Sequence, residues 1–509
     1  MYSKINTCVL QGLTGYKIEV EADISKGLRS FNMVGLPDTS IKESKERVRA
    51  AIANIGYSFP RGRLTINLAP ANLKKEGSQM DLTIAVSILT AMGEIIEPPS
   101  EEVAFLGELS LDGRILPVEG ALPMIISLQS LGLKKCIIPL ENKEESSMVK
   151  GIELICVEDL KEVVEYLNGE RKIEPFVSDG LFEFENREVF DIDFSDIKGQ
   201  LMLKRAMEIA AAGEHNLLMI GPPGSGKTMA AMRLPSILPK MTFEEAIECT
   251  KIYSVSGELG KRKMIIHRPF RDPHHTSSSV SIIGGGRIPK PGEISLAHNG
   301  ALFLDELPEF SKSTIEVLRQ PLEEKNITIA RAQASLTYPA NFLFIAGMNP
   351  CPCGYNGDPN HECNCSAGQI QKYLNKVSRP ILDRIDIHVE VQPVKFSELT
   401  DKGKEESSDA IRERVQKARD IQKKRFEKEN ISTNGLMSSR QIRKYVVLSE
   451  ELEKIIQTAF QKYKFSARSF NKILKLTRTI ADLEGSEEIK SAHLMEAIRY
   501  RTIDQKYWG

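Results

Sequence analysis

The stretch from Gly221 to Thr228, GPPGSGKT, restricts the fold of this chain more than any other feature of its sequence. It follows the apolar run NLLMI and leads into the helical pattern TMAAMRLPSIL, which is the context of a loop between a strand and a helix. In such a loop the glycines turn backbone N–H groups toward phosphate oxygens, and the helix N-terminus adds its dipole. We therefore expect nucleotide to be bound by Gly221, Pro222, Pro223, Gly224, Ser225, Gly226, Lys227 and Thr228.

Two residues of this loop and two acids further along the chain have specific expected roles. Lys227 is predicted to reach the β and γ phosphates of ATP, and Thr228 to ligate Mg²⁺. The later apolar run ALFL ends in Asp305 and Glu306. Two acids at a strand end often only cap a helix, but after a phosphate-binding loop they favour a hydrolytic pair. Asp305 would then hold the Mg²⁺ shell, and Glu306 would polarise the attacking water.

Three more side chains are candidates for catalysis. Asn349 ends the apolar run NFLFIAGMN, where its amide could position the water or sense the γ-phosphate. Arg384 lies in LDRID and Arg468 in SAR, near the start of the last helical region. Isolated arginines are usually surface residues, but an ATPase with a phosphate loop and a helical lid is expected to use one arginine from a neighbour and one from the lid.

The pattern of apolar residues predicts a multidomain α/β protein. At 509 residues, about two to four domains are expected. Residues 1–168 mix strand-like and helical runs and indicate an α+β domain, and 169–196 is acidic, interrupted by Pro and Gly, and typical of a linker. Residues 197–395 alternate near-continuous apolar strands with helices, which predicts a three-layer αβα core with a parallel sheet. Residues 396–509 indicate a helical linker and a small helical bundle.

Composition limits the partners of the chain. It has 68 Lys and Arg against 69 Asp and Glu, so any contact with nucleic acid must use a local basic surface. The N-terminus has no apolar segment behind basic residues, and no run of eighteen predominantly apolar residues occurs. We therefore expect a cytoplasmic protein with no membrane partner.

Four of the eight cysteines lie in one stretch, NPCPCGYNGDPNHECNC, which covers residues 349–365, and the four cysteines span residues 351–365. Thiolates from Cys351, Cys353, Cys363 and Cys365 would be enough to close a tetrahedral Zn²⁺ site. The paired spacing is tighter than the common pattern of zinc sites, and His361 could replace one sulfur. Free thiols are the alternative. We expect zinc in a structural role, stiffening a loop too polar to pack by itself.

Two inserts in the core are candidates for gripping a substrate. The segment RPFRDPHHTSSSVSIIGGGRIPKPGEIS carries Arg287 and Lys290, and NITIARAQASLTYP, residues 326–339, is predicted to form a β-hairpin with Arg331 near its turn. Both could be plain surface loops, but long loops in compact domains are usually functional. Arg287, Lys290 and Arg331 would follow a DNA backbone without reading bases. His274 and His275 could instead form a metal pair, although adjacent histidines seldom ligate one ion.

The whole chain resembles the ComM/YifB family of magnesium-chelatase-like AAA+ ATPases. The resemblance rests on FRDPHHTSSSVSIIGGG, KPGEISLAHNGALFLDELPEF, NPCPCGY, LDRIDIHVEV and FSARSFNKILKLTRTIADLEG. It implies that 197–395 is an AAA+ core, that Arg384 is an arginine finger and that Arg468 is the arginine of the helical lid. It also implies a homo-oligomeric ring, expected to be a hexamer, and an ATP-driven DNA translocase or helicase that promotes branch migration in recombination or natural transformation.

Residues 107–142, GELSLDGRILPVEGALPMIISLQSLGLKKCIIPLEN, look like the proteolytic domain of Lon. That resemblance raises ATP-dependent peptide cleavage by a Ser/Lys dyad as a rival function. The lysine of that family would fall after Val118–Gly120, where this chain has Ala121, Leu122, Pro123 and Met124, and Ser78 is not in a Gly-Pro-Ser-Ala-Gly frame. We expect a degenerate Lon-like domain kept for ring assembly or DNA contact, as in the RadA family.

Three alternatives to a DNA translocase remain open from the sequence. A chelatase-like motor that remodels a partner protein is supported by the similar core, although such a motor would not need a Lon-like domain. A protease is disfavoured by the missing lysine. A nucleotide switch that does not hydrolyse ATP is disfavoured because Glu306, Asn349, Arg384 and Arg468 are all present.

Overall fold

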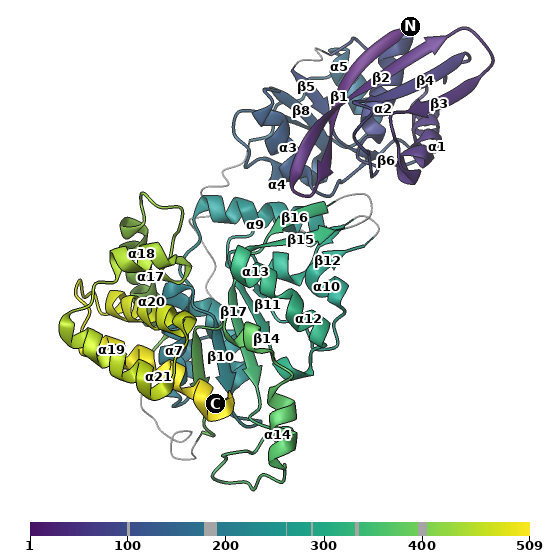
Figure 1. The fold of residues 1–509 in the computed structure, drawn as a ribbon. Helices are drawn as coiled ribbons and strands as arrows, with labels where there is room; N and C mark the ends of the chain where they lie inside the picture. Colours follow the sequence, from purple (N-terminus) through teal and green to yellow (C-terminus); the bar gives the residue numbers. More distant parts are fainter. Residues whose placement is uncertain are drawn as a thin grey trace. The chain divides into compact units, whose positions relative to one another are not determined.

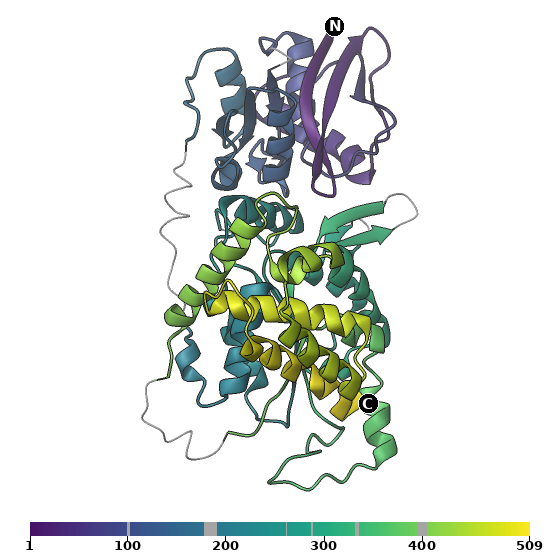
Figure 2. The same ribbon diagram turned by 60° about the vertical axis from the view of Figure 1, so that its left-hand side comes forward.

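The computed structural model describes residues 1–98, 102–177, 191–260, 262–286, 289–330, 335–394 and 405–508. The chain forms two compact units, which Figures 1 and 2 draw as ribbons. Unit 1 comprises Met1–Arg187, Ala246–Ile266 and Gly286–Lys290, and unit 2 comprises Glu188–Glu245, His267–Gly285 and Pro291–Gly509. Across the described ranges, no helix combines the length and the apolar character needed to span a membrane.

Unit 1 is built on a mixed sheet with the strand order β3-β4-β2-β1-β5-β8-β9. The long strands β1 and β2 pair antiparallel, and β5, β8 and β9 pair in parallel. Helix α2 is buried nearly all round, which explains its mostly apolar sequence DLTIAVSILTAM. The bounds are β1 Tyr2–Gln11, β2 Thr14–Ser25, β3 Ser30–Val34, α1 Thr39–Asn54, β4 Arg63–Ala69, α2 Asp81–Met92, β5 Val103–Phe105, β6 Glu108–Leu109, β7 Ile115–Leu116, α3 Ala121–Ser130, β8 Lys135–Pro139, α4 Lys143–Ser146, β9 Glu153–Val157 and α5 Leu160–Leu167.

Part of helix α9, Phe243–Ser256, also belongs to unit 1 although it follows the phosphate loop in the chain. The Ser254 hydroxyl donates a 2.6 Å hydrogen bond to the Glu145 carboxylate, and the backbone N–H of Gly120 donates to the Ser254 carbonyl at 3.1 Å. Burial raises the pKa of Glu145, although bonds from Ser254 and Asn142 oppose this effect. The long insert between the phosphate loop and the two acids is therefore divided between the units.

Unit 2 contains a five-stranded sheet in the order β11-β14-β17-β10-β18, and every pairing within it is parallel. The strands β10, β14 and β17 are buried along their whole length, as their near-continuous apolar sequences predicted. The predicted parallel sheet is thus confirmed. Its strands are β10 Leu217–Ile220, β11 Phe270–Arg271, β14 Ala301–Leu304, β17 Leu343–Met348 and β18 Ile387–Glu390.

Helices and short ribbons surround this sheet. Helices α7 and α21 pack against β18, and α7 also contacts β10. Figure 1 labels α7 beside β10. The predicted hairpin is observed, with β15 Asn326–Ala330 antiparallel to β16 Ser335–Pro339, while its tip with Arg331 lies outside the described residues. The remaining elements before the C-terminal helices are α7 Leu201–Gly213, α8 Lys227–Arg233, α10 Ser279–Ile283, β12 Gly284–Gly285, β13 Lys290–Pro291, α11 Glu293–Leu296, α12 Lys312–Val317, α13 Arg319–Glu324, α14 Ala367–Leu374 and α15 Arg379–Leu382.

The C-terminal region of unit 2 is helical, as its sequence pattern predicted. Helices α17 and α20 both pack on α7, so apolar residues of the C-terminal helices and of the sheet form one hydrophobic core. This continuity ties the C-terminal helices firmly to the sheet. Their bounds are α17 Ser408–Arg425, α18 Ser439–Tyr445, α19 Glu450–Tyr463, α20 Ala467–Leu483 and α21 Ser491–Trp508.

Gly300, directly before β14, lies close to the backbone of Pro269, directly before β11, and a substitution can test this close approach. A Cβ atom there would lie 1.9 Å from the Pro269 carbonyl oxygen, so the backbone would have to shift. We predict that Gly300→Ala lowers the free energy of unfolding by about 1–3 kcal/mol in urea denaturation. The matched control is Gly368→Ala in α14, where a Cβ would meet no atom within 4 Å. Equal stability of the two variants would contradict the close approach of the backbone.

Candidate functional site

The phosphate loop lies at the carboxyl end of β10. Gly224 and Gly226 have φ angles of 72° and 89°, which side chains other than glycine rarely adopt, and Lys227 is the first residue of α8. The Lys227 ammonium donates to the carbonyls of Gly221 at 2.7 Å and Pro222 at 2.9 Å. Burial lowers the pKa of Lys227 to about 8, and the Asp305 and Glu306 carboxylates offset part of that effect. The lysine is thus folded against its own loop.

The other predicted nucleotide-site residues converge on this loop. The Thr228 hydroxyl donates to the Asp305 carboxylate, so the two expected Mg²⁺ ligands are in contact. Asn349, directly after β17, accepts from the Lys227 ammonium at 3.3 Å. Gly347 makes room for the acid, since a Cβ there would lie 2.6 Å from Asp305 Oδ1. These oxygens form a donor set that suits Mg²⁺.

Glu306 stands beside the loop with its side chain about half exposed. Its backbone adopts a φ of 51°, and its N–H donates to Asp305 Oδ1 at 2.9 Å. Its Oε2 lies 3.4 Å from Nδ1 of His275, whose ring packs edge-on against Phe310. Sequence reasoning had weighed His275 only as part of a metal pair with His274. The structure instead brings His275 to the acid expected to polarise water.

Arg384 lies at the other end of the strands, on the side of the sheet where their amino ends meet, which we call the amino edge; the phosphate loop lies at the carboxyl edge. It precedes β18, and its carbonyl accepts a 2.8 Å hydrogen bond from the side chain of Asn216, the residue before β10. Because β10 and β18 are parallel and each spans four residues, roughly 13 Å of strand separates Arg384 from the phosphate loop. Arg384 therefore cannot touch a phosphate held by its own loop without leaving this position.

The Arg384 side chain is 9% exposed and is occupied within its own chain. Its guanidinium forms an ion pair with Glu323 of α13 and donates to the Pro380 carbonyl. The hydrogen bond with Arg384 lowers the pKa of Glu323. A role for Arg384 at a phosphate would require this ion pair to open.

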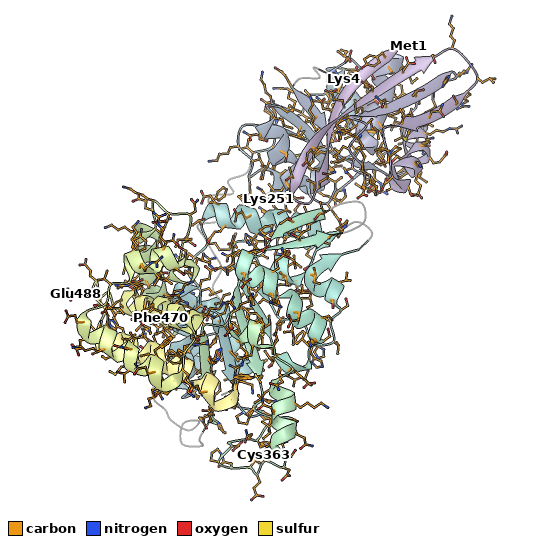
Figure 3. The ribbon with its side chains drawn as sticks, viewed as in Figure 1. Met1, Lys4, Lys251, Cys363, Phe470 and Glu488 are labelled. Atoms are coloured by element: carbon orange, nitrogen blue, oxygen red, sulfur yellow. The ribbon has the colours of Figure 1, made fainter. Side chains whose placement is uncertain are left out.

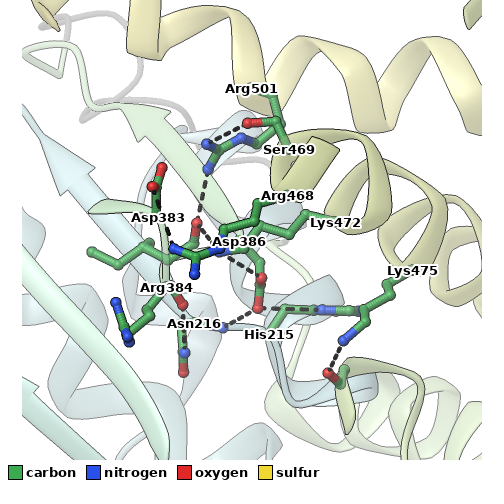
Figure 4. A network of polar contacts seen from close by, with 12 residues as sticks. His215, Asn216, Asp383, Arg384, Asp386, Arg468, Ser469, Lys472, Lys475 and Arg501 are labelled. Carbon is green, nitrogen blue, oxygen red and sulfur yellow. Dashed lines mark hydrogen bonds and ion pairs between the residues drawn. The ribbon is translucent and has the colours of Figure 1, made fainter. Parts of the chain in front are cut away.

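Arg468, at the start of α20, lies beside Arg384 at the same edge. Its guanidinium is 3.8 Å from the carboxylate of Asp383, the neighbour of Arg384, and its side chain is 64% exposed. Figure 4 shows Arg384, Asp383 and Arg468 close together. The two predicted arginines thus form one group, away from the phosphate loop of the same chain.

A buried charge network behind this group was missed from the sequence. Asp386 accepts from the backbone N–H of Asn216 at 3.1 Å and lies 3.1 Å from the Lys472 ammonium of α20 (Figure 4). Burial opposes ionisation of Asp386, but Lys472, His215 and Lys475 outweigh it and its pKa is lowered. Burial lowers the pKa of Lys472 to about 8, although Asp386 opposes this. The network joins the C-terminal helices to the amino edge of the sheet.

The four cysteines of residues 351–365 come together in unit 2. Their sulfurs all lie within 4.8 Å of one another, and the Cys351–Cys353, Cys353–Cys363 and Cys351–Cys363 separations are 3.4, 3.6 and 3.7 Å. Sulfurs around a tetrahedral Zn²⁺, with bonds of about 2.3 Å, would be about 3.8 Å apart, whereas a disulfide needs about 2.05 Å. The donor set therefore fits a metal. His361 instead stacks on Tyr355 and faces Asp358.

Of the three candidate DNA-binding residues, one lies within the part of the chain that the structure describes. Lys290 belongs to unit 1 and forms a 2.6 Å ion pair with Glu119, and Arg287 and Arg331 lie outside the described residues. In the Lon-like region, the Ser78 hydroxyl donates to the Glu108 carboxylate. The residues in the expected position of the Lon lysine, Ala121, Leu122, Pro123 and Met124, are buried at the start of α3.

Three protein-family models of magnesium chelatase match the chain. "Magnesium chelatase, subunit ChlI" covers residues 193–399, "Subunit ChlI of Mg-chelatase" covers 20–142, and "Magnesium chelatase, subunit ChlI C-terminal" covers 405–501. Together with the phosphate loop on a parallel sheet, they define a magnesium-chelatase-like protein of the AAA+ class. This class implies ATPase chemistry with ATP and Mg²⁺.

Similar proteins narrow the assignment. The competence protein ComM of Haemophilus influenzae is 42% identical over 97% of this chain and 96% of its own length. YifB of Escherichia coli, described as uncharacterized, is 41% identical over 99% of this chain and 97% of its own length. Lon protease 2 of Bacillus subtilis is 28% identical over 164 residues, 29% of each chain. The chain belongs to the family that contains ComM and YifB, as its motifs predicted.

The buried Asp386 gives a testable consequence. Asp386→Asn would leave the Lys472 charge buried without its counter-ion, so we predict a loss of about 3 kcal/mol in the free energy of unfolding at pH 7. Since the pKa of Asp386 is lowered in the folded state, this contribution is present above the unfolded value of about 4 and declines as acid protonates the carboxylate. The measurement is urea denaturation at pH 7.

Asp383→Asn is the matched control, because Asp383 faces the exposed Arg468 at 3.8 Å. A partly exposed pair of this kind contributes about 0–1 kcal/mol. If the two variants unfold at the same urea concentration, the buried network does not stabilise this edge.

Proposed function

We propose that this protein is an ATP-driven, ring-shaped DNA translocase that promotes branch migration in recombination or natural transformation. The observation that carries the proposal is the separation of two groups by the sheet. Lys227, Asp305, Glu306 and Asn349 lie at its carboxyl edge, while Arg384 and Arg468 lie together at its amino edge. Each half lacks what the other supplies for ATP hydrolysis.

The carboxyl edge supplies phosphate binding and water activation. The loop N–H groups and Lys227 would bind the phosphates, and Lys227 would exchange its bonds to the loop carbonyls for phosphate oxygens. Mg²⁺, when bound by Thr228 and Asp305, neutralises phosphate charge. Glu306 would take the proton of the attacking water, with His275 at 3.4 Å steadying its carboxylate, and Asn349 would orient that water.

The amino edge supplies the positive charge that stabilises the transition state. Since Arg384 cannot reach its own phosphate loop from this position, the proposal assigns it to the nucleotide of a neighbouring copy, with Arg468 beside it. A head-to-tail contact of this kind closes into a ring when its rotation allows, and the family resemblance favours a hexamer. Approach of the neighbour would have to release Arg384 from Glu323.

The DNA part of the proposal rests on relatives and on the inserts. ComM of Haemophilus influenzae is named a competence protein, and its similarity to this chain covers nearly the whole length of both proteins. Arg287, Lys290 and Arg331 are the residues we propose to hold the DNA backbone, in which case Lys290 would exchange Glu119 for phosphate. The cofactors proposed are ATP and Mg²⁺, with Zn²⁺ at the cysteine cluster.

A chelatase-like motor acting on a protein partner is the second candidate, because the magnesium chelatase descriptions cover the core and the C-terminal helices. Strand displacement on forked and four-way DNA junctions distinguishes the two. A translocase should displace a labelled strand and hydrolyse ATP faster with DNA. ATPase activity that ignores DNA and responds to a protein partner would favour the chelatase-like motor.

Glu306→Gln tests the assignment of the base. We predict that the variant binds a fluorescent ATP analogue with unchanged affinity but loses turnover by a factor of about 10² or more, and displaces no strand. Glu309→Gln is the control, since Glu309 is a nearby exposed acid paired with Lys376 at 3.2 Å. Normal hydrolysis by Glu306→Gln would remove Glu306 from the mechanism.

Mixing two inactive variants tests the sharing of the site. Arg384→Ala keeps its own phosphate loop and Glu306, whereas Glu306→Gln keeps Arg384. In mixed rings with equal amounts of each, about one quarter of the contacts would join an intact loop to an intact arginine, so we predict that ATPase activity returns to about that level. No recovery in rings shown to be mixed would mean that Arg384 serves its own subunit.

A further inference from the structure

The cysteine loop, residues 351–365, has almost no hydrophobic core of its own. Within it only Cys351 and Gly354 are buried, and the other residues are partly or fully exposed. Cys351 accepts a hydrogen bond at 3.3 Å from the backbone N–H of Asn356, and the other three sulfurs gather around it. A loop of this composition cannot hold its shape by apolar packing. Its conformation must therefore depend on bonds that connect the four sulfurs, such as those of a shared metal ion.

Gly354, one of the two buried residues of this loop, contacts the phosphate loop. A Cβ atom on Gly354 would lie 2.6 Å from Cδ and 2.8 Å from Cγ of Pro223, so the Gly354 backbone lies directly against the Pro223 ring. Gly354 also has a φ of 90° and donates from its N–H to the Cys351 carbonyl at 3.0 Å. The Cys351–Gly354 turn therefore forms a wall of the phosphate loop.

Both ends of the cysteine loop lie close to Asn349, which contacts Lys227 of the phosphate loop. Asn349, two residues before Cys351, accepts from the Lys227 ammonium. At the other end, Ser366 follows Cys365 directly and caps α14 with a capping box. Burial raises the pKa of Tyr373 in α14, and a hydrogen bond from the backbone of Asn349 opposes it, so α14 returns to the start of the loop. Figure 3 labels Cys363 in the loop beside α14.

We propose that a Zn²⁺ ion bound by Cys351, Cys353, Cys363 and Cys365 is a structural part of the nucleotide site, because it holds Gly354 against Pro223 and Asn349 against Lys227. This inference rests on the proposed nucleotide site. It adds that nucleotide binding depends on the metal, so loss of the metal weakens that binding, although none of the four cysteines is among the residues proposed to bind the nucleotide. The metal acts through the position of Pro223 and Asn349.

The experiment measures bound metal and nucleotide affinity separately, by elemental analysis and by the fluorescence of mant-ADP in the presence of Mg²⁺. Wild-type protein should carry about one zinc per chain. Cys363→Ser should lose the zinc and weaken mant-ADP affinity by about tenfold or more. Cys156→Ser, which changes a half-buried thiol of unit 1, should alter neither.

A pair of glycine variants separates the contact from the metal. Gly354→Ala should keep the zinc and still weaken mant-ADP affinity, because its Cβ collides with Pro223. Gly357→Ala is matched to it, since Gly357 has a similar φ of 84° but no atom within 4 Å of an added Cβ. Gly357→Ala should keep both zinc and affinity.

Chelation of wild-type protein removes the dependence on variants that fold poorly. A zinc chelator that spares Mg²⁺ should weaken mant-ADP binding, and added Zn²⁺ should restore it. Zinc-free wild-type protein, or full affinity after zinc removal or in Gly354→Ala, overturns the inference. Zinc-loaded wild-type protein that binds no nucleotide contradicts the proposed function instead, so the two failures are distinct.

Discussion

Parallel pairing of β10 with β17 and β18, and of β17 with β14, determines where the candidate nucleotide-site residues of unit 2 lie. The carboxyl ends of parallel strands share one edge, so the phosphate loop, Asp305 and Asn349 must meet there. The same pairing sends Asn216 and Arg384 to the opposite edge, where they bond to each other. The sheet therefore separates the candidate nucleotide-site residues from Arg384 by the length of its strands.

The amino edge positions Arg384 and is also connected to the C-terminal helices. Asp386 links the backbone before β10 to Lys472 of α20, and α20 also carries Arg468 in its first turn. Because Asp386 is two residues after Arg384 in the chain, the Lys472–Asp386 ion pair connects the helix that carries Arg468 to the segment that carries Arg384. In a ring, this connection would link the state of one nucleotide to the position of the arginines offered to the next.

Local patterns in the sequence predicted the elements whose residues are neighbours in the chain. The phosphate loop, the buried strands, the hairpin of residues 326–339 and the cysteine cluster all follow from spacing and composition. The contacts that were missed join distant segments. Neither Asp386 with Lys472 nor His275 with Glu306 has a local pattern, because each pair depends on how strands and helices pack. Gly354 was likewise unremarked, since its contact with Pro223 exists only after folding.

We propose that one nucleotide is bound by the carboxyl edge of one copy and the amino edge of the next. The most direct test is the structure of the assembled protein with a non-hydrolysable ATP analogue and DNA, determined by electron cryomicroscopy. We predict that Arg384 has left Glu323 and that its guanidinium contacts the γ-phosphate held by the adjacent copy. An assembly in which Arg384 stays on Glu323, while each nucleotide is enclosed by residues of one copy, would contradict it.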